Sequence, residues 1–237
     1  MVELQIKFDR NSASELLKRL AAFLGYAQRI EIAVDEASER FPIGASELQL
    51  GDELVERYPG GCVLYGGQGE FHLSWPETGV GSLFALLMDD EAMHAVVNGI
   101  ADVDLHYGFA CRPAEHRLRN LIESTKSYGV EEAWVGRAYR SALPGAYWIN
   151  IIPESLLGEL GLSVNQFDSI AQSMKLVGGR NYVIQLYQAS DQWLDHAADI
   201  DAWCESTNGV FYRLEAIADL ERSHTFQEAS EALKHWR

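Results

Sequence analysis

The sequence predicts an α+β fold built on a mixed, largely antiparallel sheet with helices on one face. Apolar and polar residues alternate from position 2 to position 8, as they do in a half-buried strand. Leucines and alanines then recur on one helical side between positions 16 and 24, behind a Ser12-x-x-Glu15 capping box. With the elements that follow, the first ~110 residues have the order β-α-β-β-α-β, which is the ferredoxin-like order.

The other elements of the first half follow from alternation and turn residues. The Gly66-Gly67-Gln68-Gly69 segment predicts a hairpin turn, and Asp89-Asp90-Glu91 suits a helix start, where negative charge is favourable. The stretch 35–61 is rich in turn residues and long enough to be functional or to contain a short element. In order, we expect a strand at 29–34, the loop-like stretch at 35–61, a hairpin of 62–65 with 70–75, a helix at 83–97 and a strand at 103–111.

The second half is centred on residues 143–161. Apolar residues occupy both faces between positions 146 and 152, which predicts an interior strand. Asn150 is the polar exception and needs a hydrogen-bond partner if it is buried. Pro153 cannot donate to a strand ladder, so we expect the strand to stop there and a short leucine-rich helix to follow, closed by Gly161.

A second capping box, Ser163-x-x-Gln166, precedes apolar residues at helical spacing, and Gly178-Gly179 suits the end of that helix. The remaining expected elements are a helix at 114–128, a strand at 133–141, a helix at 167–177, a strand at 181–188, a helix at 191–204, a strand at 209–217 and a helix at 226–236. No Ser/Pro-rich linker separates the halves. We therefore expect residues 1–237 to form one compact unit with two lobes, roughly 1–112 and 113–237.

The net charge is the strongest bulk signal, because 19 lysines and arginines face 35 aspartates and glutamates, for a charge of −16. This balance argues against nucleic acid or an anionic membrane as a direct partner. It permits a basic protein partner, such as a nuclease, although acidity also serves solubility alone. There is no secretory signal pattern and no apolar run of membrane-spanning length, and the three scattered cysteines are typical of a reduced cytoplasmic protein. No cofactor is expected.

Two acidic segments are the candidate partner-binding residues. Asp191, Asp195 and Asp199 recur at i, i+4 and i+8, so they line one side of a helix with Asp201 nearby. The alternative is that this is simply the solvated face of the helix. The full set of candidate contacts is Asp191, Asp195, Asp199, Asp201, Asp89, Asp90 and Glu91.

A candidate metal site consists of Asp102, Asp104 and His106. Alternation places all three on the polar face of one expected strand, within metal-binding reach of each other. A solvated strand face would show the same pattern. No serine-nucleophile motif of the GxSxG type is present, so no catalytic residue is assigned.

Residues 143–190 resemble a known family. The segment YWINIIPESLLGELG is followed by Gly178-Gly179 and then by YVIQL, so a strand carrying W-x-N, a short helix and a strand carrying I-Q come in this order. This pattern resembles immunity proteins of bacterial polymorphic toxins, encoded beside type VI secretion effectors. The immunity protein 52 group is the most similar, and its partners resemble nuclease toxins of the Tox-REase-5 type.

The resemblance implies an inhibitor and not an enzyme. Such a protein binds its cognate toxin directly and covers the active site or blocks its assembly, and an acidic surface fits the basic DNA groove of a nuclease. Two alternatives stay open: a small metal-dependent hydrolase using Asp102, Asp104 and His106, and an effector adaptor or chaperone, which is compatible with a homodimer.

Overall fold

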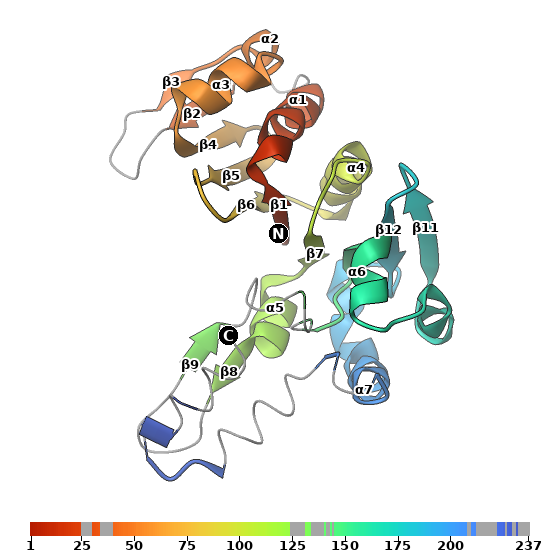
Figure 1. Ribbon diagram of the computed structural model, residues 1–237. Coiled ribbons are helices and arrows are strands. Elements are labelled where there is room, and N and C mark those ends of the chain that lie inside the picture. Colours follow the sequence, from red (N-terminus) through yellow and green to blue (C-terminus); the bar gives the residue numbers. More distant parts are fainter. Residues whose placement is uncertain are drawn as a thin grey trace.

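The computed structural model describes residues 1–24, 30–33, 40–123, 131–133, 140, 143, 145–207, 210–211, 222–225, 227–228 and 231. Within these residues the protein is an α+β fold, as the sequence predicts (Figure 1). The strands are β1 (Val2–Asp9), β2 (Glu31–Ala33), β3 (Phe41–Pro42), β4 (Gly60–Gly66), β5 (Gly69–Trp75), β6 (Val80–Leu87), β7 (Tyr107–Cys111), β8 (Leu121–Glu123), β9 (Glu131–Ala133), β10 (Ile149–Pro153), β11 (Ser173–Val177) and β12 (Asn181–Gln185).

The helices are interspersed with these strands along the chain. The α-helices are α1 (Ala13–Leu24), α2 (Ala45–Leu48), α3 (Gly51–Arg57), α4 (Asp90–Ile100), α5 (Pro113–Asn120), α6 (Glu154–Glu159) and α7 (Trp193–Glu205). The 3-10 helices are η1 (Arg10–Ser12), η2 (Val164–Ser169) and η3 (Ser190–Gln192).

One antiparallel sheet runs through both halves of the described chain. Its strand order is β11-β12-β10-β7-β1-β6-β5-β4-β2-β3, and among the described strands β8 and β9 form a separate two-stranded antiparallel sheet. The inner four strands, β7-β1-β6-β5, with α1 and α4 form a ferredoxin-like unit. The sequence predicts this kind of unit but assigns its strands differently, because β6 falls in an expected helix and the strand expected at 29–34 is β2, outside the unit. The two halves meet where β10 pairs with β7, with Ile149 opposite Ala110 and Ile151 opposite Gly108.

Strand β1 lies in the middle of this sheet and has two different faces. Val2, Leu4, Ile6 and Phe8 are buried on the face that α1 and α4 cover. Phe23 of α1 packs edge-on against Phe71 on this face, with ring centroids 5.9 Å apart. This is the expected helix-covered face.

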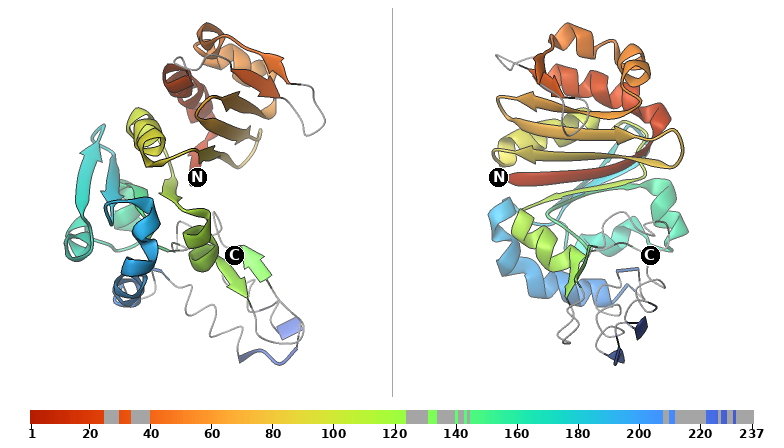
Figure 2. Two further views of the ribbon diagram at one scale, coloured as in Figure 1. Left: turned by 180° about the vertical axis from the view of Figure 1, so that it is seen from behind. Right: turned by 90° about the vertical axis from the view of Figure 1, so that its left-hand side faces the viewer.

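On the opposite face of β1, Glu3 pairs with His116 of α5. Helices therefore lie on both sides of β1, and the right-hand view of Figure 2 shows α1 on one side and α5 with α7 on the other.

Parts of the two helices expected at 83–97 and 167–177 are strands in the structure. The apolar residues at 83–87 form β6, and the helix begins only at Asp90, after the predicted cap: the Ala92 backbone N–H donates to Asp89 Oδ1 over 2.9 Å. The expected helix at 167–177 is wrong, because η2 ends at Ser169 and residues 173–177 form β11. The Ser163 and Gln166 capping box is present, but it caps η2.

Gly178 and Gly179 consequently have a different role from the helix end that the sequence suggests. Their φ angles are +60° and +67°, a left-handed conformation, and they turn the chain from β11 into β12. The loop-like stretch at 35–61 contains β3, α2 and α3 in its described part, and the strand expected at 103–111 starts only at Tyr107.

Several expectations extend beyond the described residues. The helix expected at 114–128 is α5 followed by β8, and residues 124–128 lie outside the described part. Most of the strands expected at 133–141 and 209–217 and of the helix expected at 226–236 lie outside it as well. The central strand and helix are present as β10 and α6, and Gly161 has the expected left-handed conformation after α6.

Candidate protein-binding surface

The start of α4 and the start of η3 meet, which brings the two acidic segments together. Asp90 accepts a hydrogen bond from the Ser190 backbone N–H over 2.8 Å and another from Ser190 Oγ over 2.5 Å. Arg112 Nε donates to the same Ser190 Oγ over 2.6 Å. A buried serine therefore joins residues that are 100 positions apart and places Asp191 beside the start of α4.

The seven acidic candidates divide into structural and exposed residues. Asp89 caps α4, Asp90 holds Ser190, and Asp201 accepts a hydrogen bond from Arg119 over 2.7 Å. Asp89 is itself exposed, and the four remaining candidates, Glu91, Asp191, Asp195 and Asp199, are exposed as well. We call these four residues the acidic stripe. Asp195 and Asp199 lie one turn apart on α7, roughly 6 Å along its axis, and Asp191 precedes them in η3.

A buried polar network fixes α7 to the rest of the molecule. The Glu115 carboxyl is fully buried, and it accepts hydrogen bonds from the Tyr187 hydroxyl and, over 3.2 Å, from Arg119 Nε. Arg119 continues to Asp201 on α7. The network thus links α5, the end of β12 and α7, and it holds the helix that carries the acidic stripe.

The charges in this network shift the pKa values of its members. Burial raises the pKa of Glu115 to about 7, although Arg119 and Tyr187 oppose the rise. Burial alone would lower the pKa of Arg119, but the carboxylates of Glu115 and Asp201 raise it above its ordinary value. The Arg119 guanidinium stays charged at neutral pH, whereas the Glu115 carboxyl gains or loses its proton around pH 7.

The candidate metal residues do not form a cluster. Asp102 pairs with Arg19 over 2.9 Å, and His106 Nε2 lies 3.0 Å from Asp9 Oδ2. The carbonyl of Asp104 accepts a hydrogen bond from Ser12 Oγ over 2.8 Å. All three precede β7, so strand alternation does not align them, and among the described residues no group of three His, Cys, Asp or Glu side chains can hold a metal ion.

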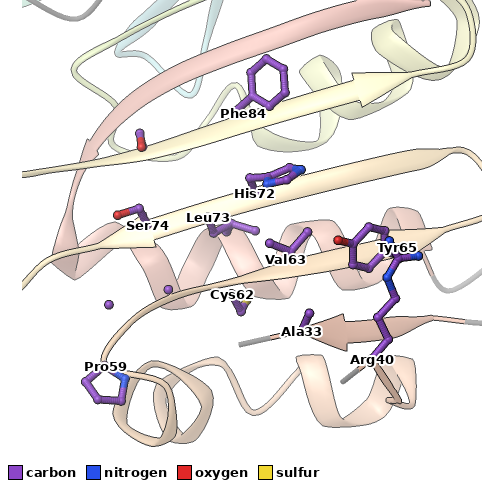
Figure 3. Close-up of a pocket in the computed structure, with 13 residues that line it drawn as sticks. Ala33, Arg40, Pro59, Cys62, Val63, Tyr65, His72, Leu73, Ser74 and Phe84 are labelled. Carbon is purple, nitrogen blue, oxygen red and sulfur yellow. The ribbon is translucent and has the colours of Figure 1, made fainter. Parts of the chain in front are cut away.

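A pocket lies on the face of β4, β5 and β6 opposite to α1. Figure 3 shows Val63, Tyr65, His72 and Phe84 side by side on these strands, with α1 behind them. Arg40 stacks on the Tyr65 ring, 3.6 Å from its centroid. This surface was not predicted from the sequence, although alternation places these side chains on the face opposite to the core.

The three cysteines do not have the features of reactive thiols. Cys62, Cys111 and Cys204 are free and buried. Burial raises the pKa of the Cys62 and Cys204 thiols to about 12, so neither forms the reactive thiolate at neutral pH.

Comparisons with protein-family models, with curated proteins and with solved structures give no significant match to this chain. None of the helices in the described part of the chain is both long enough and apolar enough to cross a membrane.

Proposed function

We propose that this chain is an immunity protein that binds and neutralises a basic toxin of a type VI secretion system, a nuclease in the first instance. It acts in the cytoplasm by direct protein–protein inhibition and catalyses no reaction. The resemblance at residues 143–190 supports the class of protein, and the net charge of −16 supports the class of partner.

The observation that carries the proposal is the junction of Asp90 with Ser190. It brings together two acidic segments from opposite halves of the chain, which carry the exposed residues of the acidic stripe. A negative surface accelerates encounter with a positively charged groove and disfavours partners of like charge.

The residues that carry the resemblance have structural roles, so they bear on the kind of protein and not on its contact surface. Trp148 Nε1 donates to the Tyr187 carbonyl over 3.0 Å. The buried Asn150 side chain bonds both the N–H and the carbonyl of Tyr147, at 3.0 and 2.8 Å. These bonds fix the entry of β10 into the sheet, which is how Asn150 satisfies its polar groups.

The test is co-expression of this chain with the toxin domain encoded beside it, followed by pull-down at low and at high salt. We expect restored growth and a complex that weakens as salt rises, because screening acts on exposed charges. Failure to restore growth together with failure to bind would overturn the proposal. A complex that forms without restoring growth would instead favour the adaptor alternative.

A further inference from the structure

A groove lies beside the acidic stripe, between α7 and the segment that links η2 to β11. It has a volume of about 550 Å³. Its floor is formed by buried residues, Leu186, Tyr187, Ile200 and Trp203, and its rim carries Ile170 and the exposed Asp199. The groove and the stripe therefore share Asp199.

The aromatic residues that line the groove are held in place. Trp203 Nε1 donates to the Gln166 carbonyl over 2.9 Å, and its ring packs against Phe167 with centroids 4.7 Å apart. The Tyr187 and His196 rings are stacked, 5.2 Å apart and 8° from parallel. Tyr187 and Trp203 are almost fully buried, so a side chain that enters the groove meets small, fixed parts of these rings and the half-buried His196, and this lowers the entropy cost of binding.

The charge at the groove has one sign. Asp199 carries a carboxylate at its rim, Asp195 lies one helical turn away, and no lysine or arginine is present among the described residues that line it. An apolar, aromatic floor with a carboxylate at the edge complements a side chain that is flat, long and positively charged.

We propose that this groove binds an arginine side chain presented by a basic protein partner. The inference rests on the proposed function for the partner's identity, but the groove itself can be tested without it. The guanidinium stacks on aromatic faces and is weakly hydrated, whereas the lysine ammonium is a strongly hydrated point charge. The arginine stem lies on Ile170 and Ile200, and its head group meets Asp199.

The experiment uses the full chain labelled at its tryptophan indoles and three blocked pentapeptides, Gly-X-Gly-X-Gly, in which X is arginine, lysine or leucine. The Trp203 indole NMR signal is assigned with Trp203→Phe. We expect the arginine peptide to shift this signal saturably, and the lysine and leucine peptides to bind at least about threefold more weakly. An unchanged Trp203 signal, or a leucine peptide that binds as well as the arginine peptide, overturns the inference.

Two variants test the contacts. Asp199→Asn should weaken the arginine peptide by about threefold, the scale of an exposed ion pair. Ala202→Trp fills the groove and should abolish the shift of the Trp203 indole signal that the arginine peptide causes. Asp168→Asn removes an exposed carboxylate outside the groove and serves as the control. Equal binding by Asp199→Asn and Asp168→Asn contradicts the arginine assignment, even if Ala202→Trp fails to fold.

The same variants separate this inference from the proposed function. If the peptide binds as expected but the chain does not protect cells from the toxin, the groove stands and the proposed function fails. If the chain protects cells and Asp199→Asn and Ala202→Trp bind the toxin as tightly as the parent protein, the proposed function stands and the groove is not its anchor.

Discussion

Glu115 is a carboxyl group buried at a junction of three segments, and its protonation links the stability of the protein to pH. Its oxygens receive hydrogen bonds from Tyr187 and Arg119, and burial raises its pKa from 4.5 to about 7. The folded state binds this proton more tightly than the unfolded state does, so protonation of Glu115 stabilises the fold. This stabilisation is fully present below pH ~4.5 and is lost as the pH rises through about 7.

Replacing Glu115 with glutamine should make the free energy of unfolding depend less on pH between about 4.5 and 7. The shift corresponds to about 3 kcal/mol between the two pH limits, at about 1.4 kcal/mol for each unit. The free energy of unfolding in urea, measured at intervals from pH 4.5 to 8, checks the difference. Glu205→Gln, at an exposed position on α7, is the control and should retain the slope of the parent protein. Equal slopes in both variants would contradict the assignment to Glu115.

Ser190 is the other residue on which the arrangement of the surface depends. Ser190→Ala removes the hydroxyl that bonds both Asp90 and Arg112, so each of these charged side chains loses a hydrogen-bond partner. We therefore expect the free energy of unfolding to fall by about 1 to 3 kcal/mol. Ser169→Ala, which removes an exposed hydroxyl, should cost much less. A Ser190→Ala protein as stable as the Ser169→Ala protein would show that the hydroxyl bonds do not stabilise the junction, which would then depend on the Ser190 backbone N–H bond to Asp90.

At the scale of elements, the hairpin of β11 and β12 shows where sequence patterns are ambiguous. Residues 173–177 fit a helical stripe and a strand equally well, and pairing with β12 decides between them. The same applies to the apolar run at 83–87, which completes the inner sheet as β6. By contrast, β1, the β4–β5 hairpin and α4 were predictable because alternation, turn glycines and the Asp89 cap each give a local signal.

Gly178 offers a direct test of this hairpin. Its φ is +60°, and an added Cβ would lie 2.9 Å from Asp102 Cβ, so Gly178→Ala should destabilise the protein by at least about 1 to 2 kcal/mol. Gly158→Ala, inside α6 with open space around it, should leave the stability unchanged or raise it by about 0.5 to 1 kcal/mol. Thermal unfolding of both variants measures the contrast. Similar behaviour of the two would contradict the turn geometry.

At the scale of the whole molecule, the acidic stripe exists because distant segments meet. The spacing of Asp191, Asp195 and Asp199 was visible in the sequence, but their proximity to Glu91 was not, since it depends on the bond between Asp90 and Ser190. The sequence likewise did not reveal that Asp201 is engaged by Arg119. The metal hypothesis failed for a related reason, since its residues lie in a loop where the period of two does not apply.

Neutralising the stripe should slow association with a basic partner more than it changes dissociation. We expect Asp191→Asn with Asp195→Asn to lower the association rate about tenfold at low salt, with the difference disappearing as salt rises. Glu53→Gln with Glu56→Gln, which removes two exposed charges from α3, is the matched control. Stopped-flow measurements with the toxin domain provide the rates. Equal rates for the two double variants would place the contact surface elsewhere.

The position of β10 beside β7 also sets an order of events during synthesis. Strands β1, β5, β6 and β7 are all complete at Cys111, so the ferredoxin-like unit leaves the ribosome before the strand that covers its edge. The chain from Cys111 to Ile149 takes roughly 2 to 8 seconds to make at about 5 to 20 residues per second. During that interval the outer edge of β7 is an unprotected template for strand pairing, which makes the nascent chain a substrate for chaperones.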